Sequence, residues 1–209
     1  MLKYLNENSA DLTTYCLQQL QLVLTALGLA LILAVVIIML FMSFKKLMRG
    51  LVYFFSALYA VPSYAFFAIL IPLTGLGVKT AVIVLTLYSE YILLRTFLTG
   101  LAEIDPGLLE AAAALGMTKK QIFFKVQLPL VIPSIFSGLK VALASVMGSA
   151  TIAATISAGG LGQVLFLGLQ TQDLTTILVG TLLTMVLTLM IMAVMQGLEY
   201  LLSKKAGIR

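Results

Sequence analysis

The sequence predicts an all-α integral membrane protein with about five transmembrane helices. Of its 209 residues, 61% are hydrophobic and only 10% are charged, whereas soluble domains average roughly 45–50% apolar and about 25% charged residues. A water-soluble fold of this size could not bury so much apolar surface. The apolar residues also form long runs, close to the roughly 20 residues that a helix needs to cross the hydrocarbon core. We therefore expect a single membrane domain over residues 1–209.

Five apolar runs predict the spans in order. The first carries no charged residue, and the second contains Pro62. The third contains Glu90 and Arg95, and the fourth is interrupted only by Lys140. The spans are expected at residues 20–44, 51–73, 78–98, 130–156 and 174–198. An odd number of spans puts the two termini on opposite sides of the membrane.

The basic residues predict which side is cytoplasmic. With five spans, nine of them fall on one side: Lys45, Lys46, Arg49, Lys119, Lys120, Lys125, Lys204, Lys205 and Arg209. The other side receives only Lys3 and Lys79. Because cytoplasmic loops are enriched in Lys and Arg, we expect the N-terminus outside and the C-terminus in the cytoplasm. The first apolar run is too long for a cleaved signal, so we expect its helix to be retained.

Composition also excludes several kinds of chemistry. The chain has no histidine and a single cysteine, Cys16, which removes most metal sites and any intramolecular disulfide. It contains no Gly-x-x-x-x-Gly-Lys-Ser/Thr loop to cradle a nucleotide phosphate. We expect no catalytic residue, no metal site and no enzymatic activity in this chain. The net charge of +5 reflects membrane topology, so no nucleic-acid partner is expected.

One cytoplasmic connection, residues 99–127, is long enough to hold structure of its own. Asp105 is placed to cap a helix that has Pro106 at its first position. Gly116 can take the left-handed conformation that ends a helix, and Thr118 begins a capping box for a second short helix. The sequence therefore predicts a compact helix–glycine–helix element. An ordinary surface loop is the alternative from these signals alone.

The same loop carries a recognisable spacing. Glu110-Ala111-Ala112, Gly116, Val126 and Leu128-Pro129 follow one another as in the EAA motif. The chain thus resembles the permease subunits of binding-protein-dependent ABC importers. The resemblance implies a coupling helix that docks onto a separate ATPase. It assigns the ATPase-coupling role to Glu110, Ala111, Ala112, Leu115, Gly116, Met117 and Thr118.

The resemblance implies a whole complex around this chain. We expect the type I ABC importer fold, similar to that of methionine permeases, in the inner (cytoplasmic) membrane of a bacterium. The expected partners are two ATPase subunits, a second permease that is identical or homologous, membrane lipid, and an extracellular or lipid-anchored substrate-binding protein. ATP and Mg would be bound by the ATPase, with no cofactor in this chain. A channel or secondary transporter is the alternative from another class.

Further segments indicate the branch of the family. Val61-Pro62-Ser63, residues 88–100, residues 148–153 and residues 158–162 resemble permeases for osmoprotectants. Those proteins import glycine betaine, carnitine or choline. The resemblance therefore predicts a translocation pathway for such a solute. A permease for methionine or another amino-acid-like solute is the alternative.

A glycine-rich element, residues 157–169, is expected at the outer surface. It follows a span in which the small residues Ser134, Gly138 and Ala142 recur every fourth position, a pattern that lets membrane helices pack closely. Its glycines permit non-helical backbone, which membrane depth tolerates only against protein or water. We expect a gate or scoop that receives substrate, formed by Ser157, Gly159, Gly160 and Gly162. A plain tight turn is the alternative.

Ionisable residues inside spans are costly and suggest function. Glu90 and Lys140 lie at similar depth on consecutive spans, so a buried ion pair between them is expected. Alternatively, Glu90 lines the substrate pathway with Ser63 and Tyr88 and contacts a cationic head group. Aromatic residues could cage a quaternary ammonium by cation–π attraction or simply pack, and the candidates are Tyr59, Tyr64, Phe66, Phe67, Tyr88 and Tyr91.

Overall fold

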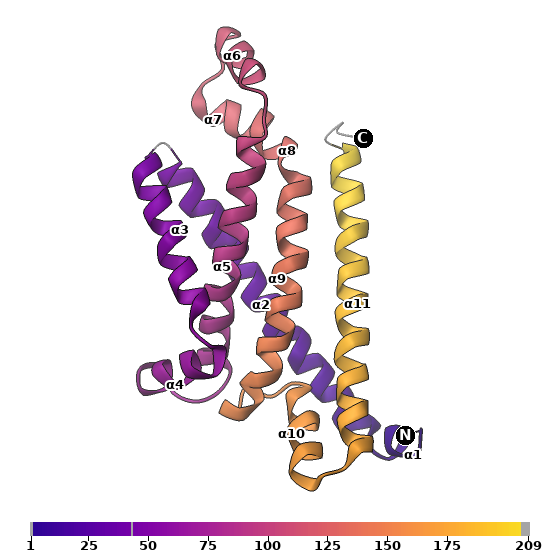
Figure 1. Cartoon of the computed structure of the whole chain (residues 1–209). Coiled ribbons are helices and arrows are strands. Elements are labelled where there is room, and N and C mark those ends of the chain that lie inside the picture. The colour runs from indigo at the N-terminus through magenta and orange to yellow at the C-terminus, as the bar shows by residue number, and fades with distance from the viewer. Residues whose placement is uncertain (1, 43, 206–209) are drawn as a thin grey trace.

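The computed structural model describes residues 2–42 and 44–205. Every regular element in this part of the chain is helical (Figure 1). The elements are α1 (Leu2–Glu7), α2 (Ser9–Phe41), α3 (Lys45–Ala60), α4 (Ser63–Thr74), α5 (Val78–Ala102), α6 (Pro106–Ala114), α7 (Lys119–Ile122), the π-helical turn η1 (Phe123–Gln127), α8 (Leu128–Leu130), α9 (Ile132–Ile152), the 3-10 turn η2 (Ala153–Ile156), α10 (Gly162–Thr171) and α11 (Leu174–Lys205).

Four helices in the described residues are long and apolar enough to cross a membrane. They are α2, α5, α9 with its extension η2, and α11, and they cover the predicted first, third, fourth and fifth spans. The first is longer than expected, because α2 begins at Ser9 rather than at residue 20. The all-α membrane fold predicted from composition is therefore confirmed.

The second span is not the continuous helix that the sequence suggested. α3 ends at Ala60, α4 begins at Ser63, and the two helices are bent by 101°. Proline lacks an amide hydrogen and pushes the preceding residue into an extended conformation, and Val61 is extended, with ψ at 131°. The hydroxyl of Tyr88 donates a hydrogen bond to the carbonyl of Val61, so the break is held from α5. α4 consequently lies across one end of the bundle (Figure 1).

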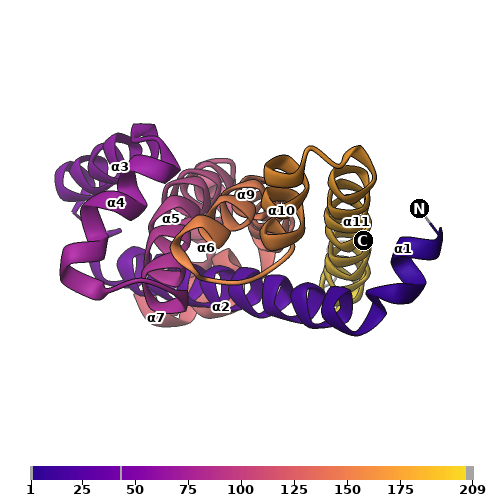
Figure 2. The same ribbon diagram turned by 90° about the horizontal axis from the view of Figure 1, so that it is seen from below.

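α5 is the central helix, and it packs most extensively against α2 and α9. Figure 2 shows α2 passing along one side of the row that α5, α9 and α11 form. Small residues allow the close approach of α9 to α5: a Cβ on Gly138 would collide with Thr96, and one on Gly100 would collide with Ser134. The predicted packing role of the small-residue row on α9 is thus confirmed.

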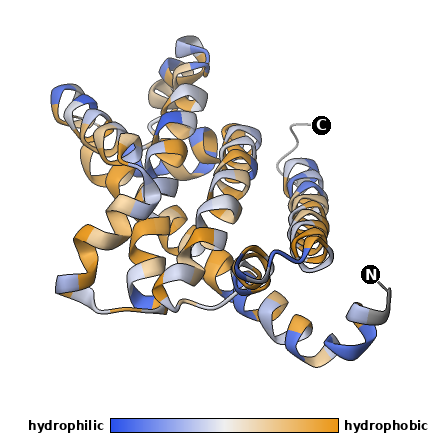
Figure 3. Ribbon diagram, turned by 60° about the horizontal axis from the view of Figure 1, so that its bottom comes forward, coloured by the Kyte–Doolittle hydropathy of each residue, from blue (hydrophilic) through white to orange (hydrophobic). Residues whose placement is uncertain are grey.

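The two ends of the bundle differ in charge. The start of α3, the α6–α7 loop and the end of α11 lie at one end, whereas α1, α4 and α10 lie at the other (Figure 1). The basic side chains of Lys46, Arg49, Lys119, Lys120 and Lys204 therefore belong to the first end. Figure 3 shows hydrophobic residues dominating the long helices between these ends. This arrangement fits an inner end that faces the cytoplasm.

Candidate functional site

The loop between α5 and α9 has the local structure that its sequence predicts. The Asp105 carboxylate accepts a hydrogen bond of 2.9 Å from the Gly107 amide at the start of α6. Gly116 is left-handed, with φ at +79°. The Thr118 amide donates to the Gln121 side chain at 2.8 Å, and the Gln121 amide donates back to the Thr118 hydroxyl at 3.3 Å. The predicted helix–glycine–helix element is confirmed, and it is rigidly capped.

α6 presents an apolar surface to solvent. Ala112 is the buried residue of this helix, while Glu110 and Ala111 are exposed. Leu115, directly after α6, is 83% exposed. The helix stands beyond the end of the bundle, away from the membrane-spanning segments (Figure 1). An exposed leucine beside alanines, on a rigid helix outside the lipid, is suited to docking against another protein.

The next part of the loop connects this surface to the helices. Phe123 is only 5% exposed and belongs to the main core. With Lys119, Lys120 and Phe124 it lines a small cavity, about 120 Å³, against Met39 in the last turn of α2 and Met42 directly after it. The π-helical turn then leads through α8 into α9. α6 is thus joined to α5 by residues 103–105 and to α9 through α7, η1 and α8, and Phe123 lies beside the end of α2.

The glycine-rich element is a left-handed turn held by two glutamines of α2. Gly159 and Gly160 have φ values of +81° and +86°. The Gly160 amide donates to the Gln18 side chain at 2.9 Å, and the Leu161 amide donates to Gln19 at 3.2 Å. A Cβ on either glycine would collide with the glutamine beside it. The expected non-helical backbone is present.

Sequence reasoning missed these two glutamines. Gln19 is fully buried and also donates to the carbonyl of Met147 at 3.4 Å, so it ties the turn to α9. The available signal in the sequence was a pair of adjacent glutamines, Gln18 and Gln19, at the start of an apolar run. Gly162 has a separate reason to be glycine, since its Cβ would collide with the carbonyl of Thr151 and the side chain of Ala154. The whole element is therefore clamped between α2 and α9.

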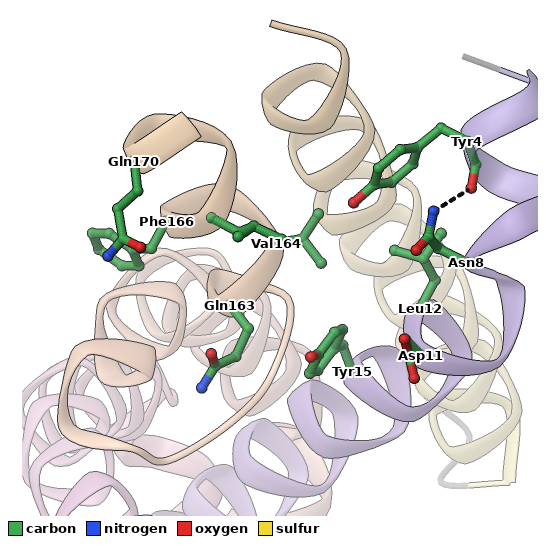
Figure 4. A pocket seen from close by; sticks show the side chains of 10 residues that line it. Tyr4, Asn8, Asp11, Leu12, Tyr15, Gln163, Val164, Phe166 and Gln170 are labelled. Atoms are coloured by element: carbon green, nitrogen blue, oxygen red, sulfur yellow. Dashed lines mark hydrogen bonds between the residues drawn. The ribbon is translucent and has the colours of Figure 1, made fainter. Parts of the chain in front are cut away.

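A hollow of about 260 Å³ lies beside this element at the same end of the bundle. Figure 4 shows side chains of α1 and α2 on one side of it and side chains of α10 on the other. Its lining combines aromatic rings with polar groups, among them Tyr4, Asn8, Asp11, Tyr15 and Gln163. The sequence analysis did not single it out, because α10 brings the residues together only in the fold.

The expected ion pair between Glu90 and Lys140 is not formed. Lys140 instead pairs with Glu199 of α11, with 2.8 Å between Nζ and Oε2. Glu90 is fully buried, and neither of its carboxyl oxygens has a hydrogen-bond partner in the described part of the chain. One turn earlier, the Thr86 hydroxyl donates to the carbonyl of Ala26 on α2 at 3.4 Å. Glu90 therefore lies on the face of α5 that packs against α2, whereas Lys140 faces α11.

The pathway candidates are likewise not all brought together. Tyr88 is buried in a ring cluster, with centroids 5.6 Å from Tyr59 and 5.7 Å from Phe66. Ser63 is half-buried at the start of α4. Glu90 is buried on the α2 side, so it is separated from this cluster.

Comparison with known proteins identifies the family. Residues 26–207 match the family described as the binding-protein-dependent transport system inner membrane component. The chain belongs to this family and is a permease subunit of a binding-protein-dependent ABC importer. The osmoprotectant import permease protein OsmW of Salmonella typhimurium is 35% identical over 99% of this chain and 98% of its own length.

Two other relatives and one solved structure extend the comparison. The carnitine transport permease protein OpuCB of Listeria monocytogenes is 32% identical over 97% of this chain and 93% of its own. The ergothioneine transport permease/ergothioneine binding protein EgtU of Helicobacter pylori is 42% identical over 60% of this chain, which is 23% of that longer protein. An inward-facing structure of the MetNI methionine ABC transporter matches with a TM-score of 0.83 at 21% identity, covering 91% of this chain and 95% of that chain. This likeness confirms the expected type I importer fold.

Proposed function

We propose that this chain forms the translocation pathway of an ATP-driven importer for a small osmoprotectant such as glycine betaine, carnitine or choline. The observation that carries the proposal is the capped α6 helix, which exposes an apolar surface at the basic end of the bundle. The names of the full-length relatives support the solute class. Methionine transport is less favoured, because the methionine transporter shares the fold at only 21% identity.

The coupling step uses α6 and the residues after it. The proposed contact surface consists of Glu110, Ala111, Leu115, Gly116, Met117 and Thr118. Ala112, expected in the same role, is buried and supports the helix from beneath. Small alanine side chains let a partner backbone approach closely, and Leu115 supplies the apolar anchor. Because the helix is capped at both ends, closure of an ATPase moves it as a rigid lever. ATP and Mg belong to that ATPase, and this chain supplies force transmission rather than catalysis.

The complex contains two permeases and two ATPase subunits. A pathway needs two opposed halves, and α2 covers only one side of the row formed by α5, α9 and α11 (Figure 2). On the opposite side α3 packs against α5, and the remainder of that side would meet a second copy or a homologue (Figure 2). With the basic end in the cytoplasm, the N-terminus lies outside, and α10 and the glycine-rich element face the binding protein.

Substrate enters at the outer end. Ser157, Gly159, Gly160 and Gly162 form the gate or scoop that receives solute from the binding protein. Gln18 and Gln19 fix its shape through the 2.9 and 3.2 Å hydrogen bonds to the turn. A weak pathway site is sufficient, since the binding protein supplies most of the affinity.

Reconstitution tests this proposal. The permease, its ATPase and its binding protein are placed in proteoliposomes, and uptake of labelled glycine betaine, carnitine, choline and methionine is measured with and without ATP. The proposal expects ATP-dependent uptake of at least one quaternary ammonium solute. Uptake of methionine alone would contradict the solute class, and uptake independent of ATP would favour a channel or secondary transporter.

A further inference from the structure

A polar and aromatic strip crosses α3, α5 and α9 at the edge of the hydrophobic core, with Tyr88 inside the core and Tyr91 packed against it. On α5 it follows residues 88, 91, 95 and 99, which recur every three or four positions and share one helix face. The ring centroids of Tyr59 and Tyr91 lie 5.2 Å apart. The Tyr59 hydroxyl lies 3.3 Å from the Ser145 hydroxyl of α9. The strip therefore joins three helices on the side away from Glu90.

Arg95 is the cation of this strip, and its guanidinium bonds back to a side chain of the same helix. Its Nη1 donates a hydrogen bond of 2.8 Å to the Tyr91 hydroxyl, which lies one turn farther from the basic end of the bundle. Arg95 also lines a hollow of about 260 Å³ with Thr96, Thr99, Glu103, Ser134 and Ser137.

The strip is unsuited to contact with lipid. Polar groups at membrane depth need protein or water around them. By contrast, the large exposed side chains along the middle of α11 are apolar, namely Leu178, Leu182, Met185, Val186, Leu189, Met190 and Val194. The apolar face of α11 is suited to contact with lipid, whereas the strip is suited to contact with protein or an aqueous path.

We propose that Tyr59, Tyr91 and Arg95 form a weak subsite for a zwitterion that carries a quaternary ammonium and a carboxylate. This rests on the proposed function and deepens it. The two tyrosine rings receive the ammonium by cation–π attraction, and the guanidinium receives the carboxylate. Side chains one helical turn apart are separated by about 5–6 Å at Cβ, which suits a solute the size of glycine betaine. Arg95, and not Glu90, is then the charged pathway residue.

The subsite predicts a specificity that separates its two parts. Glycine betaine and carnitine carry a carboxylate and use Arg95, whereas choline lacks one and depends on the rings. Arg95→Gln removes the charge with little change in size, and Tyr91→Leu removes a ring. Matched controls outside the strip are Arg49→Gln, at an exposed cation of the same end, and Tyr64→Leu, at a tyrosine that is 62% exposed.

The experiment measures equilibrium binding of labelled glycine betaine and of choline to the permease–ATPase complex in nanodiscs, without the binding protein. We expect millimolar binding of both, a loss of about tenfold for betaine alone in Arg95→Gln, which corresponds to about 1.4 kcal/mol, and loss of both in Tyr91→Leu. Both controls should bind as wild type. Absence of betaine binding to wild type, or equal loss of both ligands in Arg95→Gln, overturns the subsite.

A transport arm distinguishes this failure from failure of the proposed function. Wild-type complex with binding protein is assayed for ATP-driven betaine uptake beside Arg95→Gln. Wild-type uptake that persists unchanged in Arg95→Gln overturns the subsite and leaves the importer intact. Binding that follows the expected pattern in a complex without ATP-driven uptake supports the subsite and contradicts the proposed function.

Discussion

Gly160 shows how one residue fixes the outer turn. Its φ of +86° and the nearby Gln19 side chain make Gly160→Ala unfavourable twice, through backbone strain of about 1–2 kcal/mol and through a collision. We expect a lower thermal unfolding midpoint of the detergent-solubilised protein. Gly148→Ala is the matched control, because a Cβ there meets nothing within 4 Å and alanine favours the helix. Equal destabilisation by both changes would contradict this account of the turn.

Asp173 gives a pH-dependent cap for α11. Its carboxylate accepts hydrogen bonds from the Thr176 hydroxyl at 2.5 Å and from the Thr175 amide at 2.9 Å. These hydrogen bonds hold the pKa of Asp173 below its ordinary value, and the bond from the Thr176 hydroxyl contributes most. The stabilisation is therefore complete above the ordinary carboxyl pKa and is lost as pH falls through the lowered one. The difference in unfolding midpoint between wild type and Asp173→Asn should vanish at acid pH, and a constant difference would refute it.

Neutralising Lys140 and neutralising Glu90 should have different effects on the protein. Lys140→Met leaves the Glu199 carboxylate, which is 19% exposed, without its partner. We expect the free energy of unfolding to fall by about 1–2 kcal/mol, because partial exposure reduces the cost of the unpaired charge. Glu90→Gln strands no partner, so assembly and uptake should persist. Chemical denaturation and uptake measure the two effects. Loss of transport with normal assembly in Glu90→Gln would restore Glu90 to the pathway.

At the residue scale, the sequence shows where along a span an ionisable side chain lies but not which neighbouring helix it faces. Glu90 and Lys140 point to different neighbours, because rotation about each helix axis depends on packing. The neighbour of Arg95 is likewise not predicted by its position in the span. Arg95 bonds to Tyr91 because the tyrosine lies four residues earlier on the same helix face. The sequence shows this spacing, but it does not show that Arg95 prefers this partner to others.

At the scale of the element, α6 is the proposed lever, and Leu115 is its exposed apolar residue. Leucine burial contributes about 1.5–3 kcal/mol, so Leu115→Ala should weaken ATPase binding roughly tenfold without altering the unfolding midpoint of the permease alone. Leu73→Ala is the control, because Leu73 is 81% exposed at the opposite end. Co-purification and binding titration with the ATPase measure the effect. Equal binding by wild type and Leu115→Ala would contradict the docking surface.

Elements whose signals are local were predicted well. Asp105, Thr118 and Gly116 define α6 and α7 within a few residues of chain, and the structure shows those caps. The broken second span was not predicted, although Pro62 was visible, because a proline inside an apolar run also occurs in kinked continuous helices. The decision depends on Tyr88, which satisfies the freed carbonyl of Val61 from another helix.

At the scale of the whole molecule, composition determined the membrane class and the spacing of basic residues matches the ends of the bundle. What the sequence could not show is which faces meet. α2 covers one side of α5 while the Tyr59–Arg95 strip stays open, and this follows from tertiary packing alone. The molecule thus combines a capped helix at one end, a clamped turn at the other, and a polar face between them.

The central claim is that α6 transmits the motion of an ATPase to the pathway. The most direct measurement is glycine betaine taken up per ATP hydrolysed by proteoliposomes that contain the complete complex with Ala111→Asp. An unpaired carboxylate in the docked surface costs about 2 kcal/mol or more. The account therefore predicts that uptake per ATP hydrolysed falls at least about tenfold. Uptake per ATP equal to that of wild type would contradict it.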